Sequence, residues 1–474
     1  MVAPTRIRSH SWGRPLRVRD VIETQRSEAA SATGGRSAIV GGGLLGLTLA
    51  LRLAAGGTPV TLFEASADLG GLASAWRIGD VTWDRHYHVT LFSDRRLRAL
   101  LAELDLEREI VWTQVGTGFY TGGRFHPMNG ALDFLRFPPL GLLDKFRLGT
   151  TILRASRIAD PLPLEDIPVE TWLTELSGHN TFEKIWRPLL RAKLGERYRE
   201  ASAAFLWAIV VRLYAARRAG LGSERFGYVP GGYARVLAGL RAKLEGLGVE
   251  FVLGAPVESV VRDPASGTFA ITTPKGRREG FARAVITAPA RFAAWMSPDL
   301  SETERGQLLD KRYQGIVCAS LLLDEPLGPY YVTNLTDEWV PFSAVIEMST
   351  LVDRATFGGG ALVYLPKYVA PDDPLFEVDD EALRELFCSA LEHMYPHFKR
   401  ESVRAFRVSR VRDVFPIATL GYSRTLPPIA TSVPGLFVVN AAHIVNGTLN
   451  ANETVSLAER ALAEIAAAPV VNRA

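Results

Sequence analysis

The chain has 474 residues, of which 47% are hydrophobic and 22% are charged, as is typical of ordinary soluble globular proteins. Its 54 lysine and arginine residues nearly balance 51 aspartate and glutamate residues, and no basic aromatic stripe occurs, so nucleic acid is not an expected partner. The only cysteines are Cys318 and Cys388, which excludes a disulfide framework or a cysteine-rich metal site and favours a reducing, cytoplasmic compartment.

The first 36 residues are rich in arginine, serine and alanine and lack the apolar core of a secretory signal. We interpret residues 1–36 as a disordered tail, with a transit peptide as the alternative for a eukaryotic source. No later stretch has the roughly 18 charge-free apolar residues that a membrane span needs. The nearest is AAFLWAIVVRLYAA (203–216), which contains Arg212 and predicts a buried or surface-associated helix.

The strongest signal is a glycine loop between a predicted strand and a predicted helix. SAIV (37–40) reads as a short apolar strand, GGGLLG (41–46) follows it, and LTLALRLAAGG (47–57) reads as a helix ended by glycines. Gly41, Gly43 and Gly46 fit the dinucleotide-binding pattern G-x-G-x-x-G in its required context. A second strand, TPVTLFEA (58–65), ends at Glu64, where a carboxylate is expected to bind the adenosine ribose. The pattern predicts a Rossmann-like dinucleotide site with its phosphates at the helix N-terminus.

The segment ADLGGLASAWRIGDVTWDRHYHV (67–89) resembles the FAD-dependent amine oxidase superfamily. That group includes protoporphyrinogen oxidases, phytoene desaturases and, more distantly, UDP-galactopyranose mutases. Its members have a double glycine, here Gly70 and Gly71, followed by an Asp-x-Gly-x-His-like stretch that runs beside the isoalloxazine ring. The resemblance implies FAD as the cofactor.

Further matches extend the resemblance over about residues 37 to 466. GAPVESVVRD (254–263) resembles the strand that meets the adenine, and GLFVVNAAHIVNGTLNANE (435–453) lies where the family has its last FAD strand and helix. The family's Gly-Asp pair is replaced by Asn440-Ala441, so Asn440 or His443 is the expected substitute for that aspartate. The FAD contacts that the resemblance implies are Gly41, Gly43, Leu45, Gly46, Glu64, Ala65, Gly70, Gly71, Leu72, His88, Val257, Asn440, His443, Asn450 and Ala451.

The resemblance implies an α/β fold with two domains. A Rossmann-like FAD-binding domain, built on a parallel sheet, is expected from the discontinuous segments 37–118, 228–292 and 413–474. An α+β substrate domain with a helical subdomain is expected from segments 119–227 and 293–412.

DRHYHV (84–89) places His86 and His88 two positions apart, and on a strand these side chains share a face. The pair is compatible with metal binding, proton transfer or packing against a flat group. No further ligand lies nearby in the sequence, so we expect no metal site. The resemblance makes His88 a flavin neighbour. His86 stands where the family usually has glycine, and it is expected to crowd the ring or to reach the substrate.

The substrate half carries weaker signals. FYTGGRFHPMNG (119–130) predicts a hairpin on which Arg124 is a candidate substrate contact or a simple edge residue. ALDFLRFPPLGLLDKFRLGTTILRAS (131–156) predicts two helices with many apolar side chains, which indicate either peripheral membrane contact or ordinary packing. TFEKIWRPLLRAKLGERY (181–198) predicts a helix interrupted at Pro188. Its Trp186 and Arg187 belong to a basic-aromatic group suited to an anion or to a solvated helix face.

RVSRVRDVFPIATLGYSR (407–424) places Arg410 and Arg412 on one face of a predicted strand that leads to Tyr422. In the superfamily this approach borders the active site, so the candidate catalytic residues include Arg410 and Tyr422. The arginines favour an acidic substrate or serve equally well in ion pairs. No second dinucleotide motif follows, and an external electron acceptor is therefore expected: oxygen, a quinone or a redox protein.

Two classes of enzyme fit these signals. The first is an FAD-dependent oxidoreductase that takes hydride from a C–H bond of a small substrate, either apolar or anionic. The alternative is a redox-neutral isomerase similar to UDP-galactopyranose mutase, which acts on a nucleotide sugar with reduced flavin. A flavoprotein without enzymatic activity is a distant third.

Overall fold

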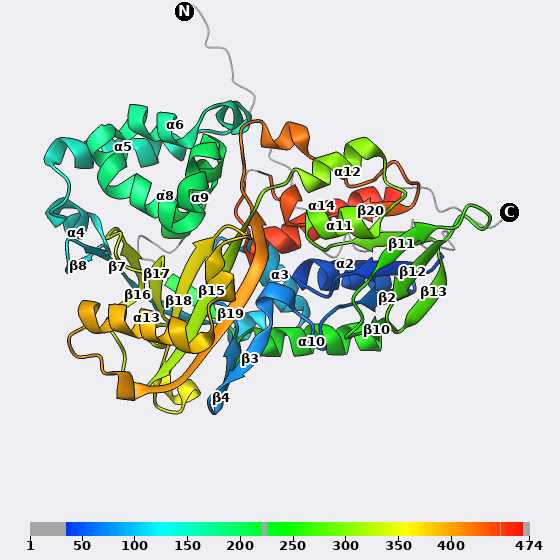
Figure 1. Cartoon of the computed structure of the whole chain (residues 1–474), viewed down its shortest axis with the longest axis horizontal. Helices are drawn as coiled ribbons and strands as arrows, with labels where there is room; N and C mark the ends of the chain where they lie inside the picture. Colours follow the sequence, from blue (N-terminus) through cyan, green and yellow to red (C-terminus); the bar gives the residue numbers. More distant parts are fainter. Residues whose placement is uncertain (1–34, 220–224, 446, 468–474) are drawn as a thin grey trace, which may run out of the picture.

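Five short parallel strands form one of the sheets in the computed structural model, which describes residues 35–219, 225–445 and 447–467 (Figure 1). In spatial order they are β10 (Glu250–Val252), β2 (Val60–Phe63), β1 (Ser37–Val40), β14 (Arg283–Ile286) and β20 (Leu436–Val438). Strands from three distant parts of the chain therefore meet in one parallel sheet, as the sequence predicts. Residues 1–34 of the predicted tail lie outside the described residues.

Both faces of this sheet are covered, which explains why its strands are continuous apolar runs rather than alternating ones. One face packs against helices α2 (Leu44–Ala55), α3 (Arg95–Glu103), α10 (Gly232–Gly246) and α14 (Ala451–Ala467). The other face packs against helices α11 (Ala290–Met296) and α12 (Glu302–Leu309) and a small antiparallel sheet of β11 (Ser259–Arg262), β12 (Phe269–Thr273) and β13 (Gly276–Phe281). Within β1, Ile39 belongs to the first core and Val40 to the second.

A second, larger sheet lies beside the first one (Figure 1). Its order is β19 (Val403–Pro416), β15 (Tyr313–Leu323), β18 (Ala361–Val369), β17 (Ala344–Glu347), β16 (Tyr330–Leu335), β7 (Gly116–Thr121) and β8 (Arg124–Pro127). All neighbours are antiparallel except β16 and β7. The predicted hairpin at 119–130 is confirmed as β7 and β8, which turn at Gly122 and Gly123. Helix α13 (Asp380–Met394) packs against one face of the sheet.

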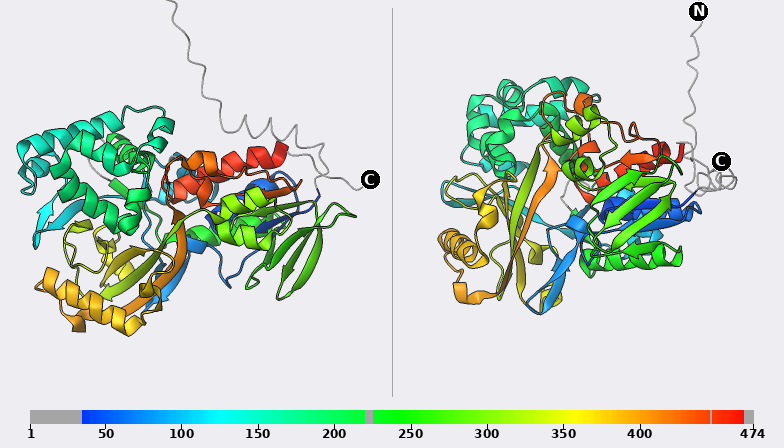
Figure 2. Two further views of the ribbon diagram at one scale, coloured as in Figure 1. Left: turned by 45° about the horizontal axis from the view of Figure 1, so that its top comes forward. Right: turned by 45° about the vertical axis from the view of Figure 1, so that its right-hand side comes forward.

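A helical subdomain lies against the end of the second sheet, and Figure 2 shows it as a separate group of helices. Its helices are α4 (Ala131–Arg136), α5 (Leu142–Ala155), α6 (Val169–Ser177), α7 (His179–Thr181), α8 (Arg187–Leu194) and α9 (Ala203–Ala219). The interruption predicted at Pro188 takes the form of a π-helical turn at Phe182–Trp186, directly before α8. Within the described ranges, the structure contains no helix that is long and apolar enough to cross a bilayer.

The two sheets are joined by a hairpin and the segment that follows it. The hairpin consists of β3 (Ala75–Ile78) and β4 (Val81–Asp84), and a small sheet of β5 (Thr90–Leu91), β9 (Arg225–Tyr228) and β6 (Val111–Gln114) comes next. DRHYHV does not place its two histidines on one strand face, because β4 ends at Asp84 and residues 85–89 are irregular. Side-chain hydrogen bonds replace the sheet ladder there, so His86 and His88 contact different elements.

Candidate functional site

The glycine loop is packed so closely that two of its glycines have no room for a side chain. A Cβ atom on Gly46 would lie 1.9 Å from the carbonyl oxygen of Gly41, and one on Gly41 would lie 2.4 Å from Thr287 Oγ1. Gly41 also has a φ of +114°, which disfavours any residue with a side chain. These contacts bring the first turn of α2 against the end of β1, as the G-x-G-x-x-G pattern requires.

Gly43 is the open position of the loop. A Cβ atom built there meets nothing within 4 Å, although Gly43 precedes α2 directly and no side chain caps the helix. The double glycine supports the loop from outside: Gly70 N donates to Gly42 O at 2.8 Å, and a Cβ atom on Gly71 would lie 3.3 Å from Gly43 Cα. The free N–H groups at the start of α2 thus lie in a cradle of glycine backbone, which suits a diphosphate.

Glu64 lies at the end of β2, beside this cradle. Its Oε2 accepts a hydrogen bond from Gly42 N at 2.6 Å, and its Oε1 accepts one from Ser66 N at 2.7 Å. The segment after β10 runs alongside, because Ala255 N donates to Glu64 O at 2.9 Å. Val257, two residues further on, packs against the core of the sheet. The end of β2 and the segment after β10 therefore run side by side at this point.

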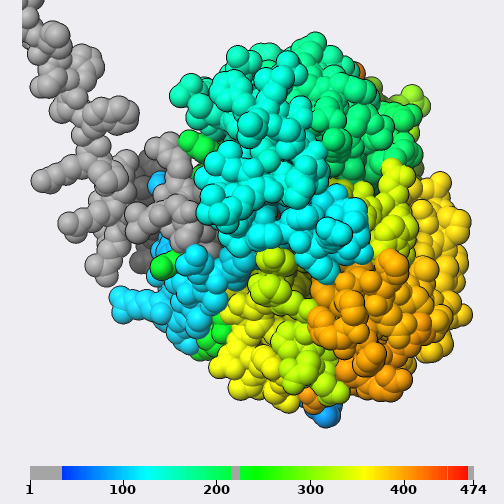
Figure 3. All heavy atoms as spheres, turned by 90° about the vertical axis from the view of Figure 1, so that its left-hand side faces the viewer, coloured from blue at the N-terminus to red at the C-terminus, as the bar shows by residue number. Residues whose placement is uncertain are grey.

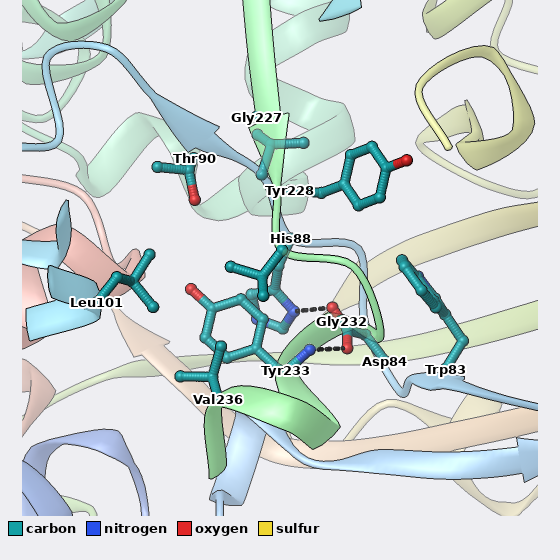
Figure 4. A pocket seen from close by; sticks show the side chains of 12 residues that line it. Trp83, Asp84, His88, Thr90, Leu101, Gly227, Tyr228, Gly232, Tyr233 and Val236 are labelled. Carbon is teal, nitrogen blue, oxygen red and sulfur yellow. Dashed lines mark hydrogen bonds and ion pairs between the residues drawn. The ribbon is translucent and has the colours of Figure 1, made fainter. Parts of the chain in front are cut away.

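Figure 4 shows a small pocket on the α10 side of the irregular segment. Asp84 is buried there, and its Oδ1 accepts a hydrogen bond from Tyr233 N at 2.7 Å at the start of α10. Its Oδ2 lies 3.7 Å from Nδ1 of His88, and the His88 ring packs against the Tyr233 ring with centroids 4.8 Å apart. The pocket leaves no room for a side chain at Gly232, whose Cβ atom would lie 2.7 Å from Asp84 Oδ1.

His86 connects the two halves of the molecule. Its Nδ1 lies 3.2 Å from Leu72 O, in the short helix η1 (Gly71–Ala73) after the double glycine, and its Nε2 lies 3.1 Å from Ser409 Oγ on β19. A carbonyl oxygen can only accept a hydrogen bond, so Nδ1 carries the proton of the neutral ring. Nε2 then accepts a hydrogen bond from the hydroxyl of Ser409. Burial, with a contribution from the neighbouring His88, lowers the pKa of His86 to about 4, so the ring is neutral near pH 7.

Two more bonds tie the irregular segment to the second sheet. The hydroxyls of Tyr87 and Tyr368, on β18, lie 2.7 Å apart, and the hydroxyl of Tyr364 donates to the backbone oxygen of Asp84. The segment is therefore bonded to β18, β19, η1 and the start of α10. Within the described residues, no group of three or more His, Cys, Asp or Glu side chains is arranged to hold a metal ion.

The candidate FAD contacts near the C-terminus lie together, and most of their polar atoms are hydrogen-bonded to neighbouring protein groups. Asn440 Oδ1 accepts from Ala442 N at 3.0 Å, and its buried Nδ2 has no partner among the described residues. His443 accepts from Asn440 N through Nδ1 and donates to Pro427 O through Nε2, and burial lowers its pKa. Asn450 accepts from Glu453 N at 3.0 Å where α14 begins at Ala451. Asn440 thus offers the one buried donor that this group leaves unbonded.

The candidate substrate residues are not brought into one cluster. Arg124 is exposed on the edge strand β8, and Trp186 is buried in the helical subdomain, where its Nε1 donates to Ser177 Oγ at 3.0 Å. Arg187 pairs with Glu183 at 2.5 Å. Tyr422 is buried and donates to Ala442 O at 2.9 Å.

Arg410 lies on the opposite face of the second sheet from His86. Neighbouring residues of a strand point to opposite faces, and Ser409 is the residue that meets His86. Arg410 pairs with Asp380 of α13 at 2.7 Å, and Arg412 pairs with Glu377. Both arginines therefore serve in ion pairs, which is one of the two roles that the sequence leaves open.

Several residues that shape the site give no clear signal in the sequence. Thr287 fixes the glycine loop, Ser409 binds His86, and Tyr233 binds Asp84, although each is distant from its partner along the chain. Tyr233 follows the Pro-Gly-Gly segment of 230–232, and that motif is the only local feature that marks it.

Comparisons with known proteins agree with this geometry. A model of the flavin-containing amine oxidoreductase family matches residues 46–451. The carotenoid phi-ring synthase of Streptomyces griseus is 27% identical over 447 residues, covering 85% of this chain and 81% of that protein.

Solved structures share the fold at low sequence identity. A provisionally named protoporphyrinogen oxidase from Exiguobacterium sp. 255-15 is 19% identical, with a TM-score of 0.71 over 92% of this chain and 99% of that one. Putrescine oxidase bound to putrescine is 17% identical (TM-score 0.69; 91% and 99% covered). Reduced UDP-galactopyranose mutase is 15% identical (TM-score 0.68; 91% and 95% covered).

Gly43→Ala separates cofactor binding from folding. Because Gly43 has an extended backbone and free space around it, we expect the variant to fold with little loss of stability, about 1 kcal/mol or less. The added methyl group enters the cradle where the diphosphate would lie. The dissociation constant of the variant for FAD should therefore rise at least about tenfold. Circular dichroism and FAD titration measure the two effects. Gly149→Ala, which also adds a methyl group in open space, is the control, and wild-type FAD affinity in Gly43→Ala contradicts the assignment.

The neutral state of His86 makes stability depend on pH. In the unfolded chain His86 binds a proton below its ordinary pKa of 6.5. In the folded protein it stays neutral until the pH reaches about 4. The stability contributed above pH 6.5 is therefore lost as the pH falls towards 4, by up to about 3 kcal/mol. Urea unfolding at several pH values should show a shallower acid loss for His86→Gln than for the wild type. His179→Gln, at an exposed position, should match the wild type. If the free energy of unfolding falls equally with pH in all three proteins, His86 does not cause the acid loss of stability.

Proposed function

The chain belongs to the flavin-containing amine oxidoreductase family and is an FAD-dependent oxidoreductase, and from this premise we propose that its substrate is an apolar, lipid-dissolved molecule. FAD, when bound, supplies the hydride acceptor for a C–H bond of that substrate. The observation that carries the proposal is an exposed apolar surface on helices α4 and α5. The phi-ring synthase, a relative named for a carotenoid, supports the same class of substrate.

We assign the FAD-binding role to residues that fit the group. Gly43 and the start of α2 would hold the diphosphate, with Gly70 and Gly71 behind them, and Glu64 would bind the ribose. The unbonded Nδ2 of Asn440 is a donor at the position where the family has its ribityl-binding aspartate. His86 and His88 keep the segment beside η1 in place; in this proposal they position the site and do not exchange protons.

The apolar surface consists of two stripes on neighbouring helices. Leu132 and Leu135 lie three residues apart on α4, and Leu142, Leu143 and Phe146 lie on one face of α5, with 77, 62 and 69% of these last three side chains exposed. The opposite stripe of α5, which includes Leu148 and Ala155, is buried in the helical subdomain. Figure 3 views the face of the molecule on which these helices lie, coloured cyan. Exposed apolar side chains that gather on one face of a protein mark interaction surfaces.

Exposed arginines on the same helices outnumber the two aspartates there, Asp133 and Asp144. Arg136, Arg147, Arg154 and Arg157 are exposed on α4, on α5 and just after α5. Leucine and phenylalanine flanked by arginine are suited to the interface of an anionic membrane. We therefore propose that the protein takes up its substrate at the membrane surface, through α4 and α5.

A nucleotide sugar is less compatible with the arrangement. The arginines that would bind its diphosphate in a mutase-like enzyme are paired: Arg187 with Glu183, Arg191 with Glu196 and Glu338, and Arg410 with Asp380. The redox-neutral isomerase therefore remains the alternative. The electron acceptor in the proposed reaction is external: oxygen, a quinone or a redox protein.

Anaerobic mixing of the FAD-loaded protein with candidate substrates tests the reaction class. An apolar polyene in detergent should bleach the flavin absorbance, because hydride transfer reduces the cofactor, whereas a nucleotide sugar should not. The polyene product should carry one additional double bond. Turnover of a nucleotide sugar only after dithionite reduction, with no net electron change, would establish the isomerase instead.

Vesicle co-sedimentation tests the membrane surface. The triple variant Leu142→Ser, Leu143→Ser, Phe146→Ser should bind vesicles of anionic phospholipid at least about tenfold more weakly, since each apolar side chain contributes up to about 1.5–3 kcal/mol on full burial. Its folding stability should hardly change, because the side chains are exposed.

The matched control replaces three exposed leucines elsewhere: Leu247→Ser, Leu386→Ser, Leu420→Ser. It should bind vesicles like the wild type. Equal binding by the two triple variants would remove α4 and α5 from the membrane contact.

A further inference from the structure

A second small pocket lies where the helical subdomain meets the C-terminal part of the chain. Glu165 on the short helix η3 (Leu162–Asp166) lines it from one side, with Ser202 just before α9 and Phe205 within α9. Tyr422, which begins the short helix η10 (Tyr422–Thr425), and Gly447 line the other side. The pocket has room for about one group of the size of a water molecule.

Glu165, which lines this pocket, has one carboxylate oxygen without a hydrogen-bond partner among the described residues. The side chain is 1% exposed, and its Oε2 accepts hydrogen bonds from Ser423 N at 3.0 Å and Ser423 Oγ at 2.7 Å. Its Oε1 is buried and has no hydrogen-bond partner among the described residues. A buried carboxylate oxygen without a donor is unfavourable, so the pocket needs a group that donates to it.

Ser202 adds a second unpartnered oxygen. Its side chain is fully buried, and its Oγ has no partner within the described part of the chain. The position of the residue is fixed, because its backbone N donates to Ala418 O at 2.9 Å. Two buried oxygens on different elements are thus held at one pocket.

The neighbouring cations already have partners. Arg424 pairs with Asp166, and Lys311 Nζ donates to Thr425 Oγ1 at 2.7 Å and lies 5.1 Å from the centroid of the Tyr422 ring. The hydroxyl of Tyr422 is bound to Ala442 O, so the ring of Phe205 is the aromatic group on which the proposal draws. A carboxylate, a hydroxyl and an aromatic ring together favour a small cation that donates N–H bonds.

We propose that this pocket binds an ammonium group, either the free ammonium ion or the end of a small primary amine. Such a group has N–H donors for both Glu165 Oε1 and Ser202 Oγ and gains from the ring of Phe205. The site is independent of the substrate proposed above, and it ties η3 to the segment that leads into the last parallel strand.

Thermal unfolding of the FAD-loaded protein tests the site. At one ionic strength, ammonium chloride should raise the melting temperature by about 2 °C over sodium chloride and choline chloride. Glu165→Gln and Ser202→Ala should each abolish this difference. Asp166→Asn, which removes the adjacent exposed carboxylate, is the matched control and should keep it. Methylammonium chloride distinguishes the two sources, since stabilisation by it as well identifies a site for organic amines.

Two results would overturn the proposal. Equal melting temperatures in all four salts would mean that the pocket holds only water. An ammonium effect that persists in both Glu165→Gln and Ser202→Ala would place the ion elsewhere. Flavin absorbance, recorded in the same samples, checks that each variant is folded and loaded.

Discussion

The segment from Asp84 to Val89 is the joint on which the arrangement of the two sheets depends. Asp84 binds the start of α10, His86 binds both η1 and β19, and Tyr87 binds β18. Asp84 and His86 are buried and Tyr87 is partly buried, and a buried polar group without a partner costs about 1–3 kcal/mol. The two sheets are therefore held at the one spacing at which Asp84, His86 and Tyr87 can all make their hydrogen bonds. A histidine at position 86 makes such a joint, because its neutral ring donates on one side and accepts on the other.

The cofactor site inherits its position from this joint. η1 follows the double glycine, and the double glycine packs on the G-x-G-x-x-G loop, so the cradle at Gly43 is held in register with β19 through Leu72 and His86. The helical subdomain is attached on another side, through Glu165 and the segment at Ser423. The apolar helices α4 and α5 lie on its outer surface. The proposed cofactor site and the proposed membrane contact thus lie in separate parts of one fold.

The sequence predicts the local features well and the long-range partners poorly. The strand, glycine loop, helix and Glu64 are contiguous, and their spacing alone defines the geometry that the structure confirms. The partner of Arg410, Asp380, lies thirty positions away on another element, so the strand pattern leaves an ion pair and a substrate contact equally open. The sequence leaves the role of His86 open, because that role depends on Ser409, more than three hundred positions later. Hydrogen bonds between residues so far apart in the sequence cannot be predicted from the local spacing of residues.

The protonation state of His86 tests the joint most directly. Nitrogen-15 NMR of the FAD-loaded protein, with histidine labelled in the ring and His86→Gln used for assignment, reports the tautomer at about pH 6. The structure predicts a neutral ring with its proton on Nδ1, bound to Leu72, and with Nε2 as the acceptor from Ser409. An imidazolium, or a ring with its proton on Nε2, would contradict it.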